Sequence, residues 1–385
     1  MLILYVAMKH DYGRPEQGYS HEHCNFFDSL WRMGHDVIYF DFLGLLQVHG
    51  REEMNRRLVE VAKKRKPHLM FTLLHQDELD PGAVREISAQ PDTVTVNWFS
   101  DDHFRFDTFS RQWAPCFNWA VTTSPGAVAK YQQAGYRNVI RSQWACNHFL
   151  YTRLDLPLEH DVTFIGQAHG RRRETVEAIR AAGFKIGVWG SGWEAGRLSQ
   201  EAMVRVFNQS RINLNFSEGA GWRPSWGERL RLEFLRHLGL LWGGQQVKAT
   251  ARFLLGWLAS KGRSAAAETA PNKKSFPKQV KARNFEIPGC GGFLLTGLGE
   301  GLEECYRLGK EVVCFESQDE LLSKLNYYLS REDERAAIAE AGFQRTLREH
   351  TYERRFNEIF RRIGFAGSAL MQPGGYEAGV VEEIR

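Results

Sequence analysis

Alternation between short apolar, β-rich runs and longer helix-like stretches is the feature that most constrains how this 385-residue chain can fold. The apolar runs of the first part are LILYVAM at 2–8, DVIYF at 36–40, HLMFTLL at 68–74, TVTVNWF at 93–99, WAVTT at 119–123 and NVIRSQW at 138–144. Helix-like stretches separate several of them, as at 51–66 and 125–136. Because such alternation favours a parallel sheet covered by helices on both faces, we predict an α/β fold with a Rossmann-like domain over residues 1–150.

The same pattern begins again after a linker at 151–160. Strand-like DVTFIG, FKIGVWG and INLNFS alternate with helix-like RRRETVEAIRAAG and EAMVRVFNQS, and EVVCFE continues the series after an interruption. We predict a second Rossmann-like domain over 151–345, a last amphipathic helix within 346–365 and a flexible, glycine-rich tail at 366–385. Two such domains in series imply a cleft, and ligands of open α/β sheets bind outside the carboxyl ends of the strands.

The interruption at 218–277 differs from its surroundings in charge. From Glu218 to Lys278, eleven Lys and Arg stand against four Glu, so this segment carries +7 although the whole chain carries +4. Its apolar residues recur at helical spacing, which predicts two amphipathic helices with cationic faces. Such helices suit the surface of an anionic membrane. The alternatives are that their apolar faces pack on the second domain, or that their cations bind a nucleic acid.

Composition and the N-terminus exclude several classes of protein. Apolar residues make up 43% and charged residues 25% of the chain, which is ordinary for a globular protein and unlike a disordered one. The six cysteines show no metal-ligand spacing, so we expect reduced thiols in a cytoplasmic protein. The apolar run at 2–8 has no basic region before it and is too short to span a bilayer. The histidines of HEHC at 21–24 are two positions apart and would not share a helix face, which argues against a metal site there.

The stretch KARNFEIPGCGGFLLTG at 281–297 is a candidate ligand site in the second domain. Its pattern predicts a short helix, a glycine-rich turn and a buried strand, with Glu286 on the last turn of the helix. A carboxylate there faces the negative end of the helix dipole, so we expect ligand hydroxyl groups to explain Glu286. A second candidate is FIGQAHGRRR, where Gly166 ends a strand and Arg171 and Arg173 open a helix suited to a phosphate. Solvated arginines at an ordinary turn are the alternative.

Several motifs, in this order, resemble those of the CgeB-like family of glycosyltransferases, which have the GT-B fold. They are DVTFIGQ with the arginines after it, VWGSGW, SRINLNFS, QVKARNFEIPGCGGFLLTG, GKEVVCF and EHTYERRF. NWFSDDHFRFD and AGYRNVIRSQWACNH resemble the amino-terminal domain usually joined to them. The resemblance implies two Rossmann-like domains facing a central cleft, a nucleotide-sugar donor held mainly by the second, an acceptor facing the first, and a C-terminal helix at 346–365 that crosses back.

The resemblance also implies roles for the segment from Lys281 to Glu286. In retaining members of the broader group, a Glu at the position of Glu286 accepts hydrogen bonds from the donor ribose hydroxyls, and Lys281 and Arg283 would neutralise the diphosphate. Fixed cations and a helix N-terminus stabilise a departing diphosphate, so no metal or other cofactor is expected. The alternative is that the cations are solvated and Glu286 pairs with one of them. Lys278 stands where the broader group carries another Glu, which leaves open whether the reaction retains or inverts the configuration of the sugar.

Two further segments contribute candidate donor contacts. Trp189, Gly190 and Trp193 of VWGSGW would line the pocket of the nucleotide base, unless the tryptophans belong to the core beside a turn. Asn215 and Ser217 end the INLNFS strand at the expected cleft and would contact phosphate, unless they cap the strand.

The acceptor side is expected after two strands of the first domain. Asp101, Asp102 and His103 follow TVTVNWF, and His75 follows the other strand, HLMFTLL. A doubly wound domain exposes functional groups to its cleft at these positions. Glycosyl transfer requires the acceptor hydroxyl to lose its proton, which a carboxylate or an imidazole can accept, so we expect one of the two aspartates to act as the base or to position the acceptor. A helix cap, a solvated turn or a divalent-ion site are the alternatives.

Together these patterns predict an enzyme that transfers a sugar from a nucleotide sugar to a glycan or lipid-linked acceptor, in the synthesis of a cell-surface polysaccharide or glycoconjugate. A non-catalytic protein that retains the fold and a nucleic-acid glycosyltransferase are the alternatives. We expect a cytoplasmic protein, with a peripheral position at the inner face of the cell membrane if the segment 218–277 binds lipid.

Overall fold

The computed structural model describes residues 1–217, 278–365 and 378–384. The basic insertion expected at 218–277 lies outside these residues, as do 366–377 and 385, so the amphipathic helices expected in the insertion remain a prediction. The described part of the chain forms two β-sheets with helices on both faces, as the alternation in the sequence predicts.

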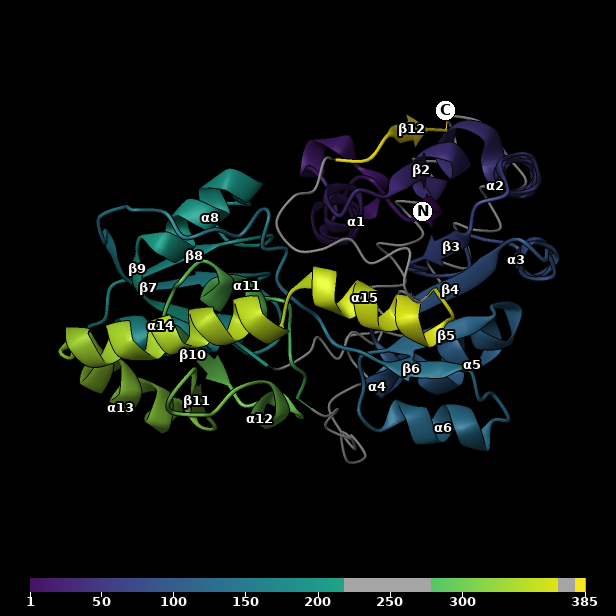
Figure 1. The fold of residues 1–385 in the computed structure, drawn as a ribbon. Coiled ribbons are helices and arrows are strands. Elements are labelled where there is room, and N and C mark those ends of the chain that lie inside the picture. The colour runs from purple at the N-terminus through teal and green to yellow at the C-terminus, as the bar shows by residue number, and fades with distance from the viewer. Residues whose placement is uncertain (218–277, 366–377, 385) are drawn as a thin grey trace, which may run out of the picture. The chain divides into compact units, whose positions relative to one another are not determined.

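The first sheet is parallel throughout, in the order β12-β2-β1-β3-β4-β5-β6 (Figure 1). Its strands are β1 (Leu2–Val6), β2 (Asp36–Phe40), β3 (Leu69–Thr72), β4 (Val94–Phe99), β5 (Trp119–Thr122), β6 (Val139–Arg141) and β12 (Val381–Glu383). Each of the six apolar runs of the first part contains one strand. The tail predicted to be flexible is partly a strand, because Val381–Glu383 pairs with β2.

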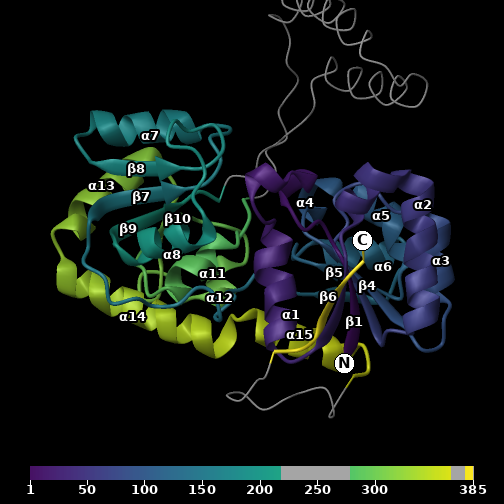
Figure 2. The ribbon, with the colours of Figure 1, turned by 90° about the horizontal axis from the view of Figure 1, so that it is seen from above.

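Successive residues of the strands point to opposite faces of the first sheet and bury different helices. Ile3 and Tyr5 of β1 share a core cluster with residues of α1 and α15. Leu4 and Val6 share a second cluster with residues of α2, α3 and α6. Figure 2 shows α1 and α15 along one face of the sheet and α2 and α3 along the other. These helices are α1 (Asp28–Arg32), α2 (Phe42–Arg65), α3 (Pro81–Ser88), α6 (Ala127–Gln133) and α15 (Tyr352–Arg362).

The second sheet is also parallel, in the order β11-β10-β9-β7-β8. Its strands are β7 (His160–Ile165), β8 (Ile186–Trp189), β9 (Ser210–Asn215), β10 (Leu294–Gly297) and β11 (Val313–Phe315). Residues of α7 and α13 share one core cluster with it, and residues of α8 and α11 belong to another. These helices are α7 (Arg172–Ala181), α8 (Gln200–Asn208), α11 (Arg283–Gly289) and α13 (Gln318–Leu329).

Three short α-helices and one long one remain in the described part of the chain, besides short 3-10 and π-helical segments. They are α4 (Asp102–Arg105), α5 (Arg111–Trp113), α12 (Leu302–Cys305) and α14 (Glu332–Glu349). The helix α14 was not predicted, although its Ala, Glu and Arg residues have high helix propensity. None of the helices in the described residues combines the length and the apolar character needed to cross a bilayer.

Each sheet has a switch point, where the chain adds strands first on one side of a central strand and then on the other. In the first sheet β1 lies between β2 and β3, and in the second β7 lies between β8 and β9. Because the connections leave the sheet on opposite faces there, a crevice forms outside the carboxyl ends of the strands. Two cavities of the described structure lie at these ends.

Candidate active site

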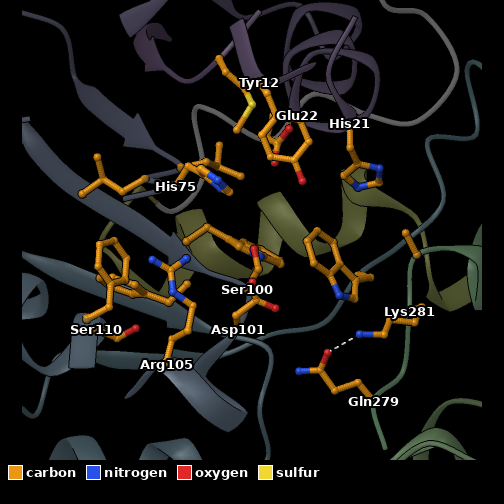
Figure 3. A pocket seen from close by; sticks show the side chains of 18 residues that line it. Tyr12, His21, Glu22, His75, Ser100, Asp101, Arg105, Ser110, Gln279 and Lys281 are labelled. Atoms are coloured by element: carbon orange, nitrogen blue, oxygen red, sulfur yellow. Dashed lines mark hydrogen bonds between the residues drawn. The ribbon is translucent and has the colours of Figure 1, made fainter. Parts of the chain in front are cut away.

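A cavity of about 340 Å³ lies at the carboxyl end of the first sheet (Figure 3), and we name it the first-sheet cavity. Met8, His75 and Asp101 line it from the segments that follow β1, β3 and β4. Other residues that line it include Tyr12, His21, Glu22, Trp98, Arg105, Trp144, Gln279 and Lys281. The cavity therefore lies at the switch point of the sheet, on the side where the sequence analysis expected the acceptor.

The three residues of the Asp-Asp-His run have different surroundings. Asp101 lines the first-sheet cavity. Asp102 is 1% exposed and accepts a hydrogen bond of 2.9 Å from the Tyr131 hydroxyl, and burial raises its pKa. His103 contacts the side-chain amide of Gln279, and burial, followed by nearby lysines, lowers its pKa to about 3. Of the three, Asp101 is the residue that lines this cavity.

His75 lines the first-sheet cavity, as expected from its position after the strand β3. Its ring packs edge-on against Tyr12, with the ring centroids 5.4 Å apart. Burial, followed by the charge of Arg105, lowers the pKa of His75. The imidazole is therefore neutral at neutral pH and can exchange hydrogen bonds with a ligand without adding charge.

Glu22 is a residue of this cavity that the sequence analysis did not identify. It begins a π-helical segment, Glu22–Phe27, and Figure 3 shows it at the cavity wall near His21. Burial raises the pKa of Glu22 to about 7, and the charges of Asp11 and Asp101 act in the same direction. The only signal in the sequence is an acidic residue soon after the first strand, which does not show that the side chain reaches the cavity.

Two cations of the cavity are close enough to attract the Asp101 carboxylate. Burial lowers the pKa values of Lys281 and Arg105, and the charge of Asp101 opposes that effect for both. The Lys281 ammonium also donates a hydrogen bond of 2.5 Å to the side-chain oxygen of Gln279 (Figure 3). The cavity thus combines carboxylates, cations and aromatic rings.

A second cavity, of about 390 Å³, lies at the carboxyl end of the second sheet, and we name it the second-sheet cavity. Gly166 and Gly190 line it from the segments that follow β7 and β8, and Tyr151 and Arg283 also line it. Gly190 has φ +132°, and a Cβ there would lie 2.3 Å from the carbonyl oxygen of Gly166, so this close approach of two loops requires glycine. His21 lines both cavities, which are therefore adjacent.

Glu286 contacts three residues that line the second-sheet cavity, while its own side chain is fully buried. One carboxylate oxygen accepts a hydrogen bond of 2.9 Å from the Tyr151 hydroxyl and lies 3.8 Å from His21 Nδ1. The other oxygen forms an ion pair with Arg283. Because α11 begins at Arg283, Glu286 stands in its first turn, and the prediction of a last-turn position is wrong. The helix dipole therefore favours this carboxylate.

The arginines expected to hold phosphate make other contacts. The side chain of Arg171 is 74% exposed and pairs with Glu174. Arg173 donates to the carbonyl oxygen of Gly192 and lies 5.1 Å from the ring centroid of Trp193. Neither contact directs an arginine toward the second-sheet cavity.

The two tryptophans of VWGSGW support the second sheet. Trp189 packs edge-on against His160 with the ring centroids 5.6 Å apart and lies beside the core. Trp193 is 8% exposed and its indole N–H donates a hydrogen bond of 2.8 Å to the carbonyl oxygen of Gly166. Trp193 therefore fixes one wall of the second-sheet cavity, and both tryptophans pack at the core, which was the alternative to a place beside the nucleotide base.

Asn215 and Ser217 are buried at the end of β9. The Asn215 amide donates hydrogen bonds of 3.0 Å to Asn284 and 3.2 Å to Thr296. The backbone carbonyl of Ser217 accepts a hydrogen bond of 3.1 Å from the backbone N–H of Gln279. The Asn215 bonds join β9 to α11 and β10, and the Ser217 bond holds the segment before α11, so both residues have a supporting role.

Within residues 1–217, 278–365 and 378–384, no three His, Cys, Asp or Glu side chains form a group that could hold a metal ion.

Comparison with known protein families identifies the second part of the chain. Residues 171–231 and 219–361 match the family model described as "Glycosyl transferase-like". This part of the chain is a glycosyl transferase-like domain. The predicted activity class, a glycosyltransferase, is confirmed at the level of this domain. No curated protein sequence matches the chain.

Several solved structures share the fold over nearly the whole chain. A sucrose-phosphate synthase from Thermosynechococcus elongatus aligns over 95% of this chain and 100% of its own, with a TM-score of 0.58 and 10% identity. HepE from Anabaena, solved with UDP, aligns over 94% and 99%, with a TM-score of 0.53 and 12% identity. A glycosyltransferase from Rickettsia africae aligns over 94% and 98%, with a TM-score of 0.53 and 9% identity. The predicted fold class, GT-B, is confirmed by these similarities.

Proposed function

We propose that this chain transfers a sugar from a nucleoside-diphosphate sugar bound in the second-sheet cavity to a hydroxyl group of an acceptor bound in the first-sheet cavity. The observation that carries the proposal is that the two cavities, each at the switch point of its sheet, share His21 as a lining residue. A transferase needs its donor and acceptor sites in contact, because the two reacting atoms must approach closely and in a fixed orientation.

The second-sheet cavity has features that suit a nucleoside diphosphate. Gly166 and Gly190 let the two loops that follow β7 and β8 pack closely at the wall of the cavity, and Arg283 lines the cavity with a guanidinium group that can bind phosphate. HepE was solved with UDP and with UDP and glucose, which makes a UDP-sugar the first donor to test. Arg173, Trp189, Asn215 and Ser217 contribute indirectly in this proposal, by supporting the strands and loops around the ligand, and Arg171, exposed and paired with Glu174, has no part in it.

Two carboxylates have different roles in the first-sheet cavity, one as the general base and one in positioning the acceptor. With a pKa of about 7, Glu22 suits a general base, since a base works best when its pKa lies near the working pH. Asp101, attracted by Arg105 and Lys281, suits a hydrogen-bond acceptor that holds the acceptor hydroxyl in place. In the transfer, the bond from the sugar to the diphosphate breaks, the diphosphate leaves with the electron pair, and the hydroxyl proton passes to Glu22 as the new glycosidic bond forms.

The cations near the reacting atoms take the place of a metal ion in this proposal. Arg283 lies at the second-sheet cavity and Lys281 at the first, so developing charge on the leaving diphosphate would have fixed positive groups on either side. No other cofactor is required, and the nucleotide sugar is a substrate.

A narrower assignment rests on the sequence. We propose membership of the CgeB-like group, an acceptor that is a glycan or a lipid-linked glycan, and a role in the synthesis of a cell-surface polysaccharide or glycoconjugate. The +7 charge of the segment from Glu218 to Lys278 supports a peripheral position on an anionic membrane, where a lipid-linked acceptor would be found.

Donor hydrolysis and transfer assays test the function. The full-length protein is incubated with UDP-glucose, UDP-N-acetylglucosamine, GDP-mannose and dTDP-glucose, and release of the nucleoside diphosphate is measured. We expect one donor to be cleaved and the rate to rise with an acceptor. If calorimetry detects no binding of the four donors or of their three nucleoside diphosphates, UDP, GDP and dTDP, the proposed donor site is overturned.

A further inference from the structure

We infer that the first-sheet cavity takes a sugar that carries an anionic group, a carboxylate or a phosphate, and that Arg105 binds this group. The inference rests on the proposed function, because it names the chemical class of the acceptor that would occupy the cavity. Arg105 lines the cavity and is the last residue of α4.

The local chain fold holds the Arg105 guanidinium at the cavity wall. The helix α4 ends at Arg105, and the π-helical segment Phe106–Ser110 follows it directly. This brings the ring of Phe109 against the guanidinium, whose central carbon lies 4.2 Å from the ring centroid. Such a contact orients the cation, but it gives the five N–H donors of the guanidinium no oxygen acceptor.

The N–H donors of Arg105 are therefore available to a ligand. In the part of the chain that the structure describes, this guanidinium forms no hydrogen bond and no ion pair. The charges of Asp101, Glu78 and Asp102 favour its charged form, but burial outweighs them and the pKa of Arg105 is lowered. A carboxylate or a phosphate would compensate this partly buried cation through two parallel hydrogen bonds.

The position of Arg105 indicates which part of the acceptor it would bind. Figure 3 shows Arg105 and Lys281 on opposite sides of Asp101, with His21 on the Lys281 side. Because His21 also lines the second-sheet cavity, Arg105 is on the side away from the donor. The attacking hydroxyl must lie close to the donor, so a group held by Arg105 belongs to another position of the acceptor.

The remainder of the cavity suits a sugar ring. Its volume of about 340 Å³ lies at the lower end of the range of small-molecule sites, roughly 300 to 1,000 Å³, which fits a single sugar unit. Aromatic side chains offer flat apolar surfaces to the C–H groups of such a ring. Those that line the cavity are Tyr12, Trp98, Phe99, Phe109 and Trp144.

Calorimetry with matched sugars tests the inference on the full-length protein. Glucose, galactose and mannose are each compared with their 6-phosphates and with the corresponding uronates. For at least one of the three sugars, we expect an anionic form to bind about 10- to 100-fold more tightly than the neutral form, which is the usual effect of hydrogen bonds to a charged group. The two anionic series show whether the cavity takes a phosphate or a carboxylate. Equal affinity for neutral and anionic forms, or undetectable binding of all nine sugars, overturns the inference.

Variants of Arg105 locate the anionic group. Arg105→Gln should remove the preference for the anionic sugar and leave the affinity for the neutral sugar unchanged. Arg111→Gln is the matched control and should keep the preference, because Arg111 is exposed and lies outside the lining of this cavity. Arg105→Lys keeps the charge but loses the planar fork, so it should reduce the preference, and it provides the test if Arg105→Gln does not fold. An unchanged preference in either Arg105 variant means that another cation binds the anion, and it overturns the inference.

The failure of the inference can be distinguished from the failure of the proposed function. If the wild type binds a nucleotide sugar or a nucleoside diphosphate but shows no preference for an anionic sugar, the inference alone fails. If the wild type binds no nucleotide sugar and no nucleoside diphosphate, the proposed function fails, and the inference fails with it because a sugar in the first-sheet cavity would then not be an acceptor.

Discussion

Replacing Glu22 by glutamine should make the protein more stable at pH 8 and leave its stability nearly unchanged at pH 4. Burial raises the pKa of Glu22 from its ordinary value of 4.5 to about 7 in the folded chain. Above pH 7 the folded protein must therefore hold an ionised carboxylate in a site that disfavours its charge. Glutamine has almost the same shape and carries no charge.

The magnitude follows from proton linkage. Between pH 4.5 and about 7 the folded state binds a proton at Glu22 that the unfolded state has released, so the free energy of unfolding falls as the pH rises through this window. At 1.36 kcal/mol for each pKa unit, the difference corresponds to about 3 kcal/mol as an upper limit, reached above pH 7. The wild type regains this stability as the pH falls toward 4.5, where Glu22 is protonated in both states.

Urea denaturation at pH 5, 6, 7 and 8 measures the effect. We expect the difference in unfolding free energy between Glu22→Gln and wild type to grow by about 2–3 kcal/mol from pH 5 to pH 8. Glu16→Gln is the matched control, because Glu16 is exposed and lies in the same segment between β1 and α1, and it should change stability little at any of these pH values. A difference that stays constant with pH would show that Glu22 is not held in a charge-disfavouring site and would remove the main reason to regard it as a base.

Four further predictions concern activity, folding and membranes. Glu22→Gln should lower the transfer rate by about 10²- to 10⁴-fold with donor affinity intact, and the rise of the rate toward pH 7 should disappear from the pH–rate profile; a variant with normal turnover would exclude Glu22 as the base. In steady-state kinetics, Asp101→Asn should lower the transfer rate but keep the rise of the rate toward pH 7. Asp102→Asn should keep near-normal turnover, because Asp102 lies outside the cavity. Gly190→Ala should lower the free energy of unfolding in urea by about 1–3 kcal/mol more than Gly135→Ala, since both glycines have positive φ but only Gly190 approaches another loop; equal losses would contradict the argument from close approach. Sedimentation with anionic vesicles should deplete the intact protein and leave a deletion of 218–277 in solution, and equal partitioning of the two would remove the membrane proposal.

The sheets could be predicted from the sequence because their strands are buried on both faces. Runs such as LILYVAM and HLMFTLL are continuously apolar for that reason, and each contains a strand. The strand β12 has no such signal, because all three of its residues are exposed and it is held by backbone pairing with the edge of β2. Edge strands of this kind depend on an available partner rather than on an apolar pattern.

The residues of the candidate site can likewise be separated into those whose position could be predicted from the sequence and those whose position could not. His75, Asp101, Gly166 and Gly190 could be placed at cavities because each follows a parallel strand, and such strands end at one edge of the sheet. The ion pair of Glu286 with Arg283 was foreseen as the alternative for this segment. The hydroxyl partner of Glu286 could not be foreseen, since Tyr151 lies 135 residues away and nothing local connects the two. Spacing likewise could not show that Asp102 turns inward to Tyr131 while its neighbour Asp101 lines the cavity.

The short segment between Lys281 and Glu286 links the two cavities through its charges. Lys281 lines the first-sheet cavity, where it attracts Asp101, and Arg283 lines the second-sheet cavity, where it pairs with Glu286. Each of these two cations thus has a carboxylate beside it, so neither Lys281 nor Arg283 offers an isolated positive charge to a passing anion. A nucleoside diphosphate would gain less from Arg283 through long-range attraction than through directed hydrogen bonds, because the charge of the guanidinium is largely offset by Glu286. This arrangement favours recognition by geometry, which is the form of binding that a reacting diphosphate needs if its leaving oxygen is to be held in one position during transfer.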